Sequence, residues 1–331
     1  MDTKKPAREK SDNRTGRFRR WRNLLRYTIG TIIVVLSFYF LITRLIRDWH
    51  QIPFNELKFQ PLPLILSYLI LLLIHFPLSA LGWILILEGL GEKLPFFRAL
   101  TILTVTQLGK YAPGKVWFTL GRMSFARNDG IPEAKTITSV IIETGFLLLA
   151  AVFLFALAIV LLPRRVIPPL VYYSFLLAPL TIVVIYPPIL NRLLPPLLKL
   201  FKQPLFSLQL SYPRLLTILA VYILDWFFQG LGCFILINSF YHLPFASLPV
   251  LLGGYSISWI LGFIILIAPA GLGIREGIYT FILKLVMSQP VAIISALLTR
   301  IWVTTSEAVM ALLLMPLLSK GGKNGKETPT D

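Results

Sequence analysis

Two short segments of the sequence place proline, glycine and a cation side by side within apolar surroundings. The members are Pro113, Gly114 and Lys115 in the first segment, and Pro269, Gly271, Gly273 and Arg275 in the second. A helix that starts inside a membrane leaves its first backbone N–H groups without partners, and these groups carry the positive end of the helix dipole. An anion is the natural ligand of such a helix start. The two segments therefore predict a pair of sites for a phosphate group.

Each residue type has its own part in this interpretation. The proline prevents the first helical arm from continuing, and the glycines let the chain turn while a headgroup approaches the backbone. The cation adds a full charge at the start of the returning arm. A plainer alternative is that the glycines only allow close helix packing and the cations extend to headgroups at the membrane surface.

Charged residues also lie within the apolar segments themselves. Those we expect to form an intramembrane charge network are Glu143, Asp225, Arg300 and Glu307. Ionised groups are costly inside a membrane, so they are candidates for functional roles. Glu143 follows Pro132 by 11 residues and Arg300 follows Pro290 by 10. This near-equivalence predicts a salt bridge between Glu143 and Arg300, with local backbone or hydroxyl partners as the alternative.

The two broken segments belong to an internal repeat. The matching ranges are 80–87 with 230–237, 94–96 with 243–245, 112–114 with 268–271, and 131–132 with 289–290. Their offset is 149 to 150 residues at the start and 156 to 158 at the end. An internal repeat with interrupted apolar segments indicates a membrane protein whose binding site lies between the two halves.

Composition indicates an all-α polytopic membrane protein, since 56% of the residues are hydrophobic and 14% are charged. Six segments are long enough to span a bilayer. They are 27–46, 62–90, 136–162, 167–190, 213–240 and 291–318. Two further segments, 97–131 and 246–289, are expected to be broken or re-entrant helix pairs.

We divide the chain into a basic tail, a single transmembrane domain and a second tail. The bounds are 1–26 for the first tail, 27–318 for the membrane domain and 319–331 for the last, with repeats at about 62–162 and 213–318. One predicted side holds 24 Lys and Arg residues and the other holds 7. Positive charge favours the cytoplasmic side, so we expect both termini in the cytoplasm, a plasma (inner) membrane location and repeats of opposite orientation.

The formal net charge of +17 does not predict nucleic-acid binding, because ten of the basic residues lie in the first 26 positions. Such a tail suits anionic lipid headgroups. The single cysteine, Cys233, excludes an intrachain disulfide, and His75 stands alone in an apolar run, where we expect a packed polar residue. No nucleotide-binding loop or catalytic constellation is found. We therefore expect no enzyme activity, catalytic residue, metal or cofactor.

The motif at 108–117, followed by Gly121-Arg122 and Glu143, resembles the lysylphosphatidylglycerol synthase transmembrane-region family, also called the flippase-like domain family. Residues 268–277 resemble its second motif, and Arg300 fits a downstream arginine. The resemblance implies a lipid-translocating module with two inverted re-entrant elements, and it adds Arg122 and Glu276 to the candidate lipid-phosphate site. Some members carry an aminoacyl-transferase domain, which we do not expect here because the sequence ends at Asp331.

These observations predict flippase-like translocation of a phosphate-bearing lipid, either a phospholipid or a polyprenyl-linked precursor. Membrane lipids with anionic headgroups are the expected partners. One alternative is a non-transporting partner or regulator of a separate lipid-modifying or glycosyl-transfer enzyme. Another alternative is a transporter of small soluble anions.

Overall fold

The computed structural model describes residues 58–111, 117–162, 169–200, 203–204, 210–265 and 273–318, with single positions at 39, 43 and 46. Regular structure in these ranges is helical, without β-strands. The first half comprises α2 (Pro61–Ile70), the π-helical turn η2 (Leu71–His75), α3 (Phe76–Gly89), α4 (Phe96–Gln107), the 3-10 turn η3 (Leu108–Tyr111), α5 (Trp117–Asn128) and α6 (Glu133–Val160). A middle section comprises α7 (Pro169–Tyr172), η4 (Tyr173–Leu176), α8 (Leu177–Val184) and α9 (Pro187–Leu200). The second half comprises α10 (Tyr212–Asn238), η5 (Phe245–Ser247), α11 (Leu248–Ile264), α12 (Ile274–Leu283) and α13 (Gln289–Leu318).

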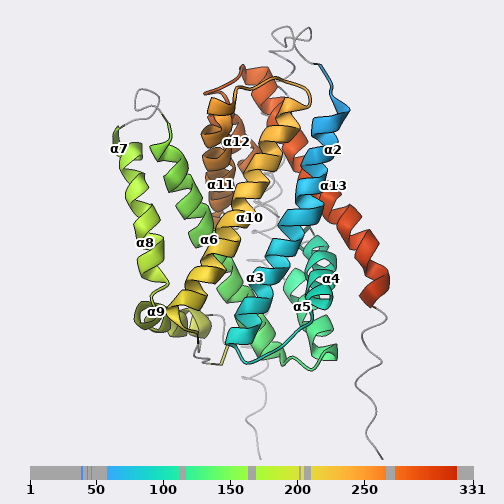
Figure 1. The fold of residues 1–331 in the computed structure, drawn as a ribbon, viewed down its shortest axis with the longest axis vertical. Helices are drawn as coiled ribbons and strands as arrows, with labels where there is room; N and C mark the ends of the chain where they lie inside the picture. Colours follow the sequence, from blue (N-terminus) through green and yellow to red (C-terminus); the bar gives the residue numbers. More distant parts are fainter. Residues whose placement is uncertain are drawn as a thin grey trace, which may run out of the picture.

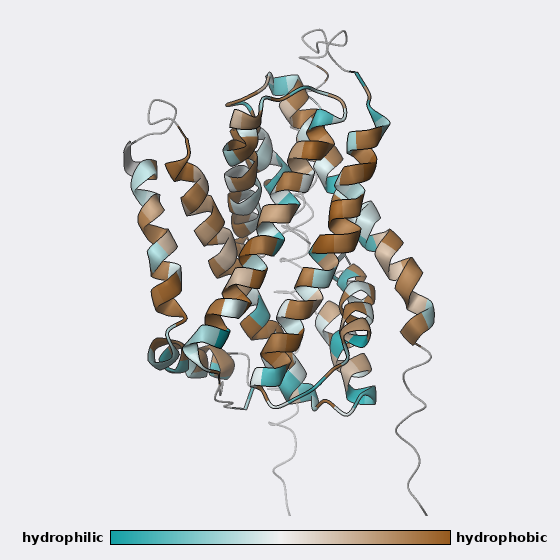
Figure 2. Ribbon diagram, viewed as in Figure 1, coloured by the Kyte–Doolittle hydropathy of each residue, from teal (hydrophilic) through white to brown (hydrophobic). Residues whose placement is uncertain are grey.

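Five helical stretches within the described ranges are long and apolar enough to cross a membrane. They are Pro61–Gly89, Glu133–Val160, Tyr212–Asn238, Phe245–Ile264 and Gln289–Leu318. Hydrophobic residues predominate along these helices, and hydrophilic residues gather at the ends of the bundle, mainly the lower one (Figure 2). The expected all-α polytopic membrane fold is therefore confirmed. The span predicted at 27–46 lies almost entirely outside the described residues.

The segment predicted to span at 167–190 is bent in the structure. Helix α8 ends at Val184, and the chain then turns by 89° into α9. The cause is local, because Pro187 and Pro188 follow after two more residues and a residue before proline is disfavoured in the helical conformation. Residues 173–200 form either one broken span or a re-entrant loop. Helices α7 to α9 stand at one side of the bundle, next to α6 (Figure 1).

The two halves of the chain have the same order of elements with opposite orientation. Helices α2 and α3 correspond to α10, and α4, α5 and α6 correspond to α11, α12 and α13. Helix α10 runs antiparallel to α3, and the α4–α5 pair lies at the opposite end of the bundle from the α11–α12 pair (Figure 1). Helix α4 has 12 residues, which is about 18 Å of helix, so it enters the bundle without crossing it.

Packing between the halves is reciprocal. Helix α4 of the first repeat packs against α13 of the second, and α11 of the second repeat packs against α6 of the first. Helices α3 and α10 pack against one another. This exchange is expected of two repeats related by a pseudo-two-fold axis, and residues from both arms of each broken segment line one cavity.

Candidate functional site

A cavity of about 240 Å³ lies where the two repeats meet. Every helix of both repeats except α2 contributes to its wall. The ionisable residues that line it are His75, Lys110, Arg122, Glu143, Asp225, Tyr255, Arg275, Arg300 and Glu307. Its apolar wall includes Leu103, Phe118, Leu147, Trp226, Trp259 and Phe263. Because both repeats supply charged and apolar groups, the cavity suits a ligand with a charged end and an apolar end.

In the first repeat, the returning arm is joined to the last helix by a buried ion pair. Arg122 on α5 donates a hydrogen bond to the Glu143 carboxylate on α6, and both residues are buried. The Arg122 guanidinium carbon also lies 4.8 Å from the centroid of the Trp83 ring. Trp83 in turn donates to the Ser139 hydroxyl at 2.9 Å. The arginine is thus held from two directions.

In the second repeat, the equivalent elements are joined by a looser pair of reversed polarity. The acid Glu276 is on α12, and Arg300 is on α13, with Nε and Oε1 3.6 Å apart. The other Glu276 oxygen accepts a hydrogen bond of 2.6 Å from the Gly273 N–H at the start of α12. Gly273 has a φ of 79°, a left-handed conformation that favours glycine.

These pairs correct two expectations. The predicted salt bridge between Glu143 and Arg300 is wrong, because each residue pairs with a partner in its own repeat. Glu276 was implied to belong to a lipid-phosphate site, yet its carboxylate occupies the helix start that a phosphate would need. The structure therefore gives Glu276 a capping and ion-pairing role, and a phosphate at that helix start would meet a negative charge.

A third ion pair crosses from one repeat to the other. Lys110 in η3 donates a hydrogen bond to Glu307 on α13. Tyr111 donates to the same carboxylate at 2.8 Å and lies 3.1 Å from the Thr304 hydroxyl oxygen. The Arg300 guanidinium carbon is 5.5 Å from the centroid of the Tyr111 ring. The end of the first arm in repeat 1 is therefore anchored to the last helix of repeat 2.

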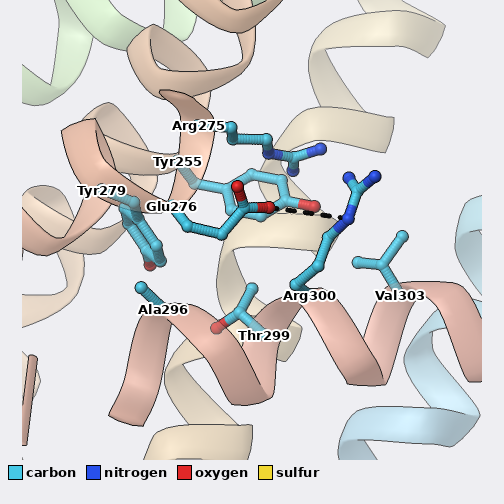
Figure 3. Close-up of a pocket in the computed structure, with 8 residues that line it drawn as sticks. All are labelled: Tyr255, Arg275, Glu276, Tyr279, Ala296, Thr299, Arg300 and Val303. Carbon is cyan, nitrogen blue, oxygen red and sulfur yellow. Dashed lines mark ion pairs between the residues drawn. The ribbon is translucent and has the colours of Figure 1, made fainter. Parts of the chain in front are cut away.

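Arg275 differs from the other cavity cations. Its guanidinium carbon lies 4.5 Å from the centroid of the Tyr255 ring. In the part of the chain that the structure describes, no carboxylate forms an ion pair with it. Figure 3 shows the guanidinium groups of Arg275 and Arg300 extending to the same side, past the Tyr255 ring. Two guanidinium groups are thus presented together at the edge of the cavity.

Asp225 has a partner that the sequence interpretation missed. Its carboxylate lies 2.5 Å from His75 Nδ1 and 3.1 Å from the Ser79 hydroxyl oxygen. His75 and Asp225 are 150 residues apart. This separation equals the repeat offset near the start of the repeats, so the offset itself was the signal that could have paired them.

Not every predicted site residue can be placed. Pro113, Gly114, Lys115, Pro269 and Gly271 lie outside the described residues. The charge-network candidates Glu143, Asp225, Arg300 and Glu307 all line the one cavity, together with Arg122 and Arg275. Across the described ranges, no group of three or more His, Cys, Asp or Glu side chains is arranged to hold a metal ion.

Fold and cavity together define the class: an α-helical membrane protein built from two inverted repeats around a charged cavity. The chain belongs to the family described as the lysylphosphatidylglycerol synthase TM region, which matches residues 23–318. This match covers every described helix and confirms the family resemblance of the two motifs. No curated protein matches the chain closely enough to be reported as a relative.

Proposed function

We propose that this protein moves a phosphate-bearing lipid from one membrane leaflet to the other by holding its headgroup in the cavity between the repeats. The observation that carries the proposal is Arg275, a cation at the cavity edge whose described neighbours include an aromatic ring and no ion-paired carboxylate. Arg275 is partly buried, and a cation that is partly removed from water is stabilised by an anion bound directly to it. A phosphate oxygen is a well-matched partner, because the guanidinium fork donates to two oxygens at once.

Arg300 strengthens this assignment. Its guanidinium extends to the same side as that of Arg275 (Figure 3), and its ion pair with Glu276 is long, with Nε and Oε1 3.6 Å apart. Two guanidinium groups on neighbouring helices, α12 and α13, can donate hydrogen bonds to one phosphate from two directions. The bound headgroup would then contact the returning arm and the last helix of the second repeat.

The apolar wall of the cavity favours a lipid over a small soluble anion. Phe118, Trp226, Trp259 and Phe263 contribute rings to the same space as the cations. A small hydrated anion gains little from such rings, whereas a lipid can place its glycerol and first acyl carbons against them. Membership of the family described as the lysylphosphatidylglycerol synthase TM region also supports a lipid-related role.

Inverted repeats supply the means of movement. Because each half presents a broken helix pair from an opposite end of the bundle, the same cavity can be reached from either leaflet when the halves rock against each other (Figure 1). We propose a transport role without catalysis for this chain. We also propose a plasma membrane location with both termini in the cytoplasm, from the distribution of Lys and Arg between the two ends.

The test is lipid exchange in reconstituted vesicles that contain a fluorescent phosphatidylglycerol. Purified protein should raise the rate at which the inner-leaflet probe becomes accessible to an impermeant quencher. Arg275→Gln should reduce this rate at least tenfold. Lys284→Gln is the matched control, since Lys284 is an exposed cation at the end of the same helix, and its rate should stay at the wild-type value.

Two outcomes would redirect the proposal. If wild-type protein exchanges no fluorescent phosphatidylglycerol or polyprenyl phosphate, the role of a partner to a separate lipid-modifying enzyme takes its place. If labelled inorganic phosphate enters the vesicles while the lipid probe does not move, the protein is a transporter of small anions.

A further inference from the structure

A polar cluster lies on the seam between the two repeats. It consists of His75 and Ser79 from the first repeat, and Asp225 and Gln229 from the second. Each pair is separated by four residues, and the two pairs are offset by 150 positions. Equivalent positions of the two repeats therefore face each other, as residues on a pseudo-two-fold axis must. All four residues line the cavity.

Asp225 is the centre of this cluster. It is fully buried within α10, and its two oxygens have separate donors. His75 Nδ1 lies 2.5 Å from Oδ1, and the Ser79 hydroxyl donates to Oδ2 at 3.1 Å. Gln229 Nε2 is 3.5 Å from Oδ2. A carboxylate inside a spanning helix is costly, and such groups mark ion or proton pathways.

The backbone around His75 is shaped by its neighbour in the sequence. Pro77 has no N–H and its ring would collide with a carbonyl one turn earlier, so the helix widens into the π-helical turn η2. The Phe76 N–H consequently bonds to the Leu71 carbonyl. His75 is the last residue of this turn, and 15% of its side chain remains accessible, next to the cavity. The imidazole thus bridges a buried carboxylate and the cavity.

We propose that the His75–Asp225 pair is a proton-binding site that couples lipid movement to proton movement, a role that rests on the proposed function. Histidine is the side chain that changes charge in the physiological pH range. With Nδ1–H donated to Asp225, the second ring nitrogen, Nε2, is the atom that takes up the proton. The product is an imidazolium paired with a carboxylate, which stays stable in a buried site because the charges offset each other.

Charge balance in the cavity indicates the stoichiometry. The other charged or titratable groups that line the same cavity are Lys110 (η3), Arg122 (α5), Glu143 (α6), Tyr255 (α11), Arg275 (α12), Arg300 (α13) and Glu307 (α13). Among the described residues, the four cations of this set are matched by four carboxylates once Asp225 and Glu276 are counted. A proton on His75 leaves one positive charge in excess. One phosphodiester carries one negative charge, so the site takes one proton with each lipid.

The experiment imposes a pH gradient on vesicles that contain wild-type protein and a short-chain fluorescent phosphatidylglycerol. Valinomycin with equal potassium on both sides holds the membrane potential at zero. Albumin extraction then measures the fraction of probe in the outer leaflet at steady state. Joint movement of proton and lipid should concentrate the probe in the leaflet on the less acidic side, by up to about tenfold per pH unit for a one-to-one ratio.

Variants locate the site. In His75→Gln and Asp225→Asn vesicles, the probe should spread equally between the leaflets under the same gradient. His242→Gln is the matched control, because His242 is exposed in the loop between α10 and α11, and this variant should concentrate the probe as the wild type does. If His75→Gln concentrates the probe in the less acidic leaflet to the wild-type level, the proposal is wrong.

The wild-type measurement decides the matter even if a variant does not fold. If the probe exchanges but stays equally distributed between the leaflets under the gradient, lipid movement is not coupled to protons. The proposed transport function then still stands. Absence of any exchange removes the transport function, and the coupling falls with it. Concentration toward the more acidic side would also contradict the proposal, because it requires proton and lipid to move in opposite directions.

Discussion

The two repeats each have an ion pair at equivalent places, with the positions of the acid and the cation exchanged. In each repeat, the returning arm of the broken segment is tied to the last helix by an ion pair. Repeat 1 places the cation on the arm (Arg122) and the acid on the helix (Glu143), whereas repeat 2 places the acid on the arm (Glu276) and the cation on the helix (Arg300). The two repeats therefore share the position of the ion pair, and they differ in which element carries the cation.

The quality of the two pairs differs as well. Arg122 and Glu143 share a direct hydrogen bond, and the arginine is also held against Trp83. The Arg300–Glu276 contact is longer, at 3.6 Å, and Glu276 divides its carboxylate between Arg300 and the start of α12. This comparison indicates that the first pair fixes its repeat, while the second can release Arg300 to a ligand at the cavity edge.

The largest expected effect comes from breaking the tight pair. Arg122→Gln leaves Glu143 buried without its cation, which should lower the free energy of unfolding by ~3–5 kcal/mol. The double variant Arg122→Gln/Glu143→Gln should recover part of this loss, because no isolated charge remains. Denaturant titration in detergent micelles measures both changes.

The matched change in the second repeat sharpens the comparison. Glu276→Gln keeps an oxygen that can accept from the Gly273 N–H, so the helix start stays capped. The loss in unfolding free energy should be about 1.5 kcal/mol, half or less of that for Arg122→Gln. Equal losses in the two repeats would show that the pairs are equivalent, and the distinction between a fixed and a releasable pair would be wrong.

An intermediate effect is expected at a pair of equivalent glycines. A Cβ at Gly82 would lie 2.5 Å from the buried Tyr222 ring, and one at Gly232 would lie 2.9 Å from the buried Trp302 ring. Either substitution by alanine should cost about 2 kcal/mol through overpacking. Gly145→Ala on α6 is the control, since a Cβ there meets nothing within 4 Å and alanine should stabilise the helix. A neutral Gly82→Ala would mean that α3 and α10 are not closely packed.

The mildest test introduces single cysteines and probes the inversion itself. Single cysteines at Glu92 and Lys202 should be protected from an impermeant thiol reagent in intact cells, whereas one at His242 should be labelled. The native Cys233 is buried, so it should contribute little background. The loops after α3 and after α10 lie at opposite ends of the bundle, as the repeats require (Figure 1). Labelling of the Lys202 position would contradict the orientation.

Local signals predicted most of the helices. The stretches at 62–90, 136–162, 213–240 and 291–318 agree with the observed helices because an apolar run of membrane-spanning length has few other folds. The bend within 167–190 also has a local cause, the adjacent prolines Pro187 and Pro188. The pairing of charges was harder, because it depends on how each helix is rotated about its axis. Equivalence in sequence paired Glu143 with Arg300, yet the helices face partners in their own repeats.

The central claim is that a phosphate-bearing headgroup occupies the cavity beside Arg275 and Arg300. Its most direct test is an electron cryo-microscopy reconstruction of the protein in nanodiscs of phosphatidylglycerol, alongside a reconstruction of Arg275→Gln. We predict density for a lipid phosphate within hydrogen-bonding distance of both guanidinium groups, with acyl chains leading toward Trp226 and Trp259. The Arg275→Gln specimen should lose this density while the helices stay in place. A wild-type cavity that contains no lipid density, with lipid ordered only on the outer surface of the bundle, would contradict the account.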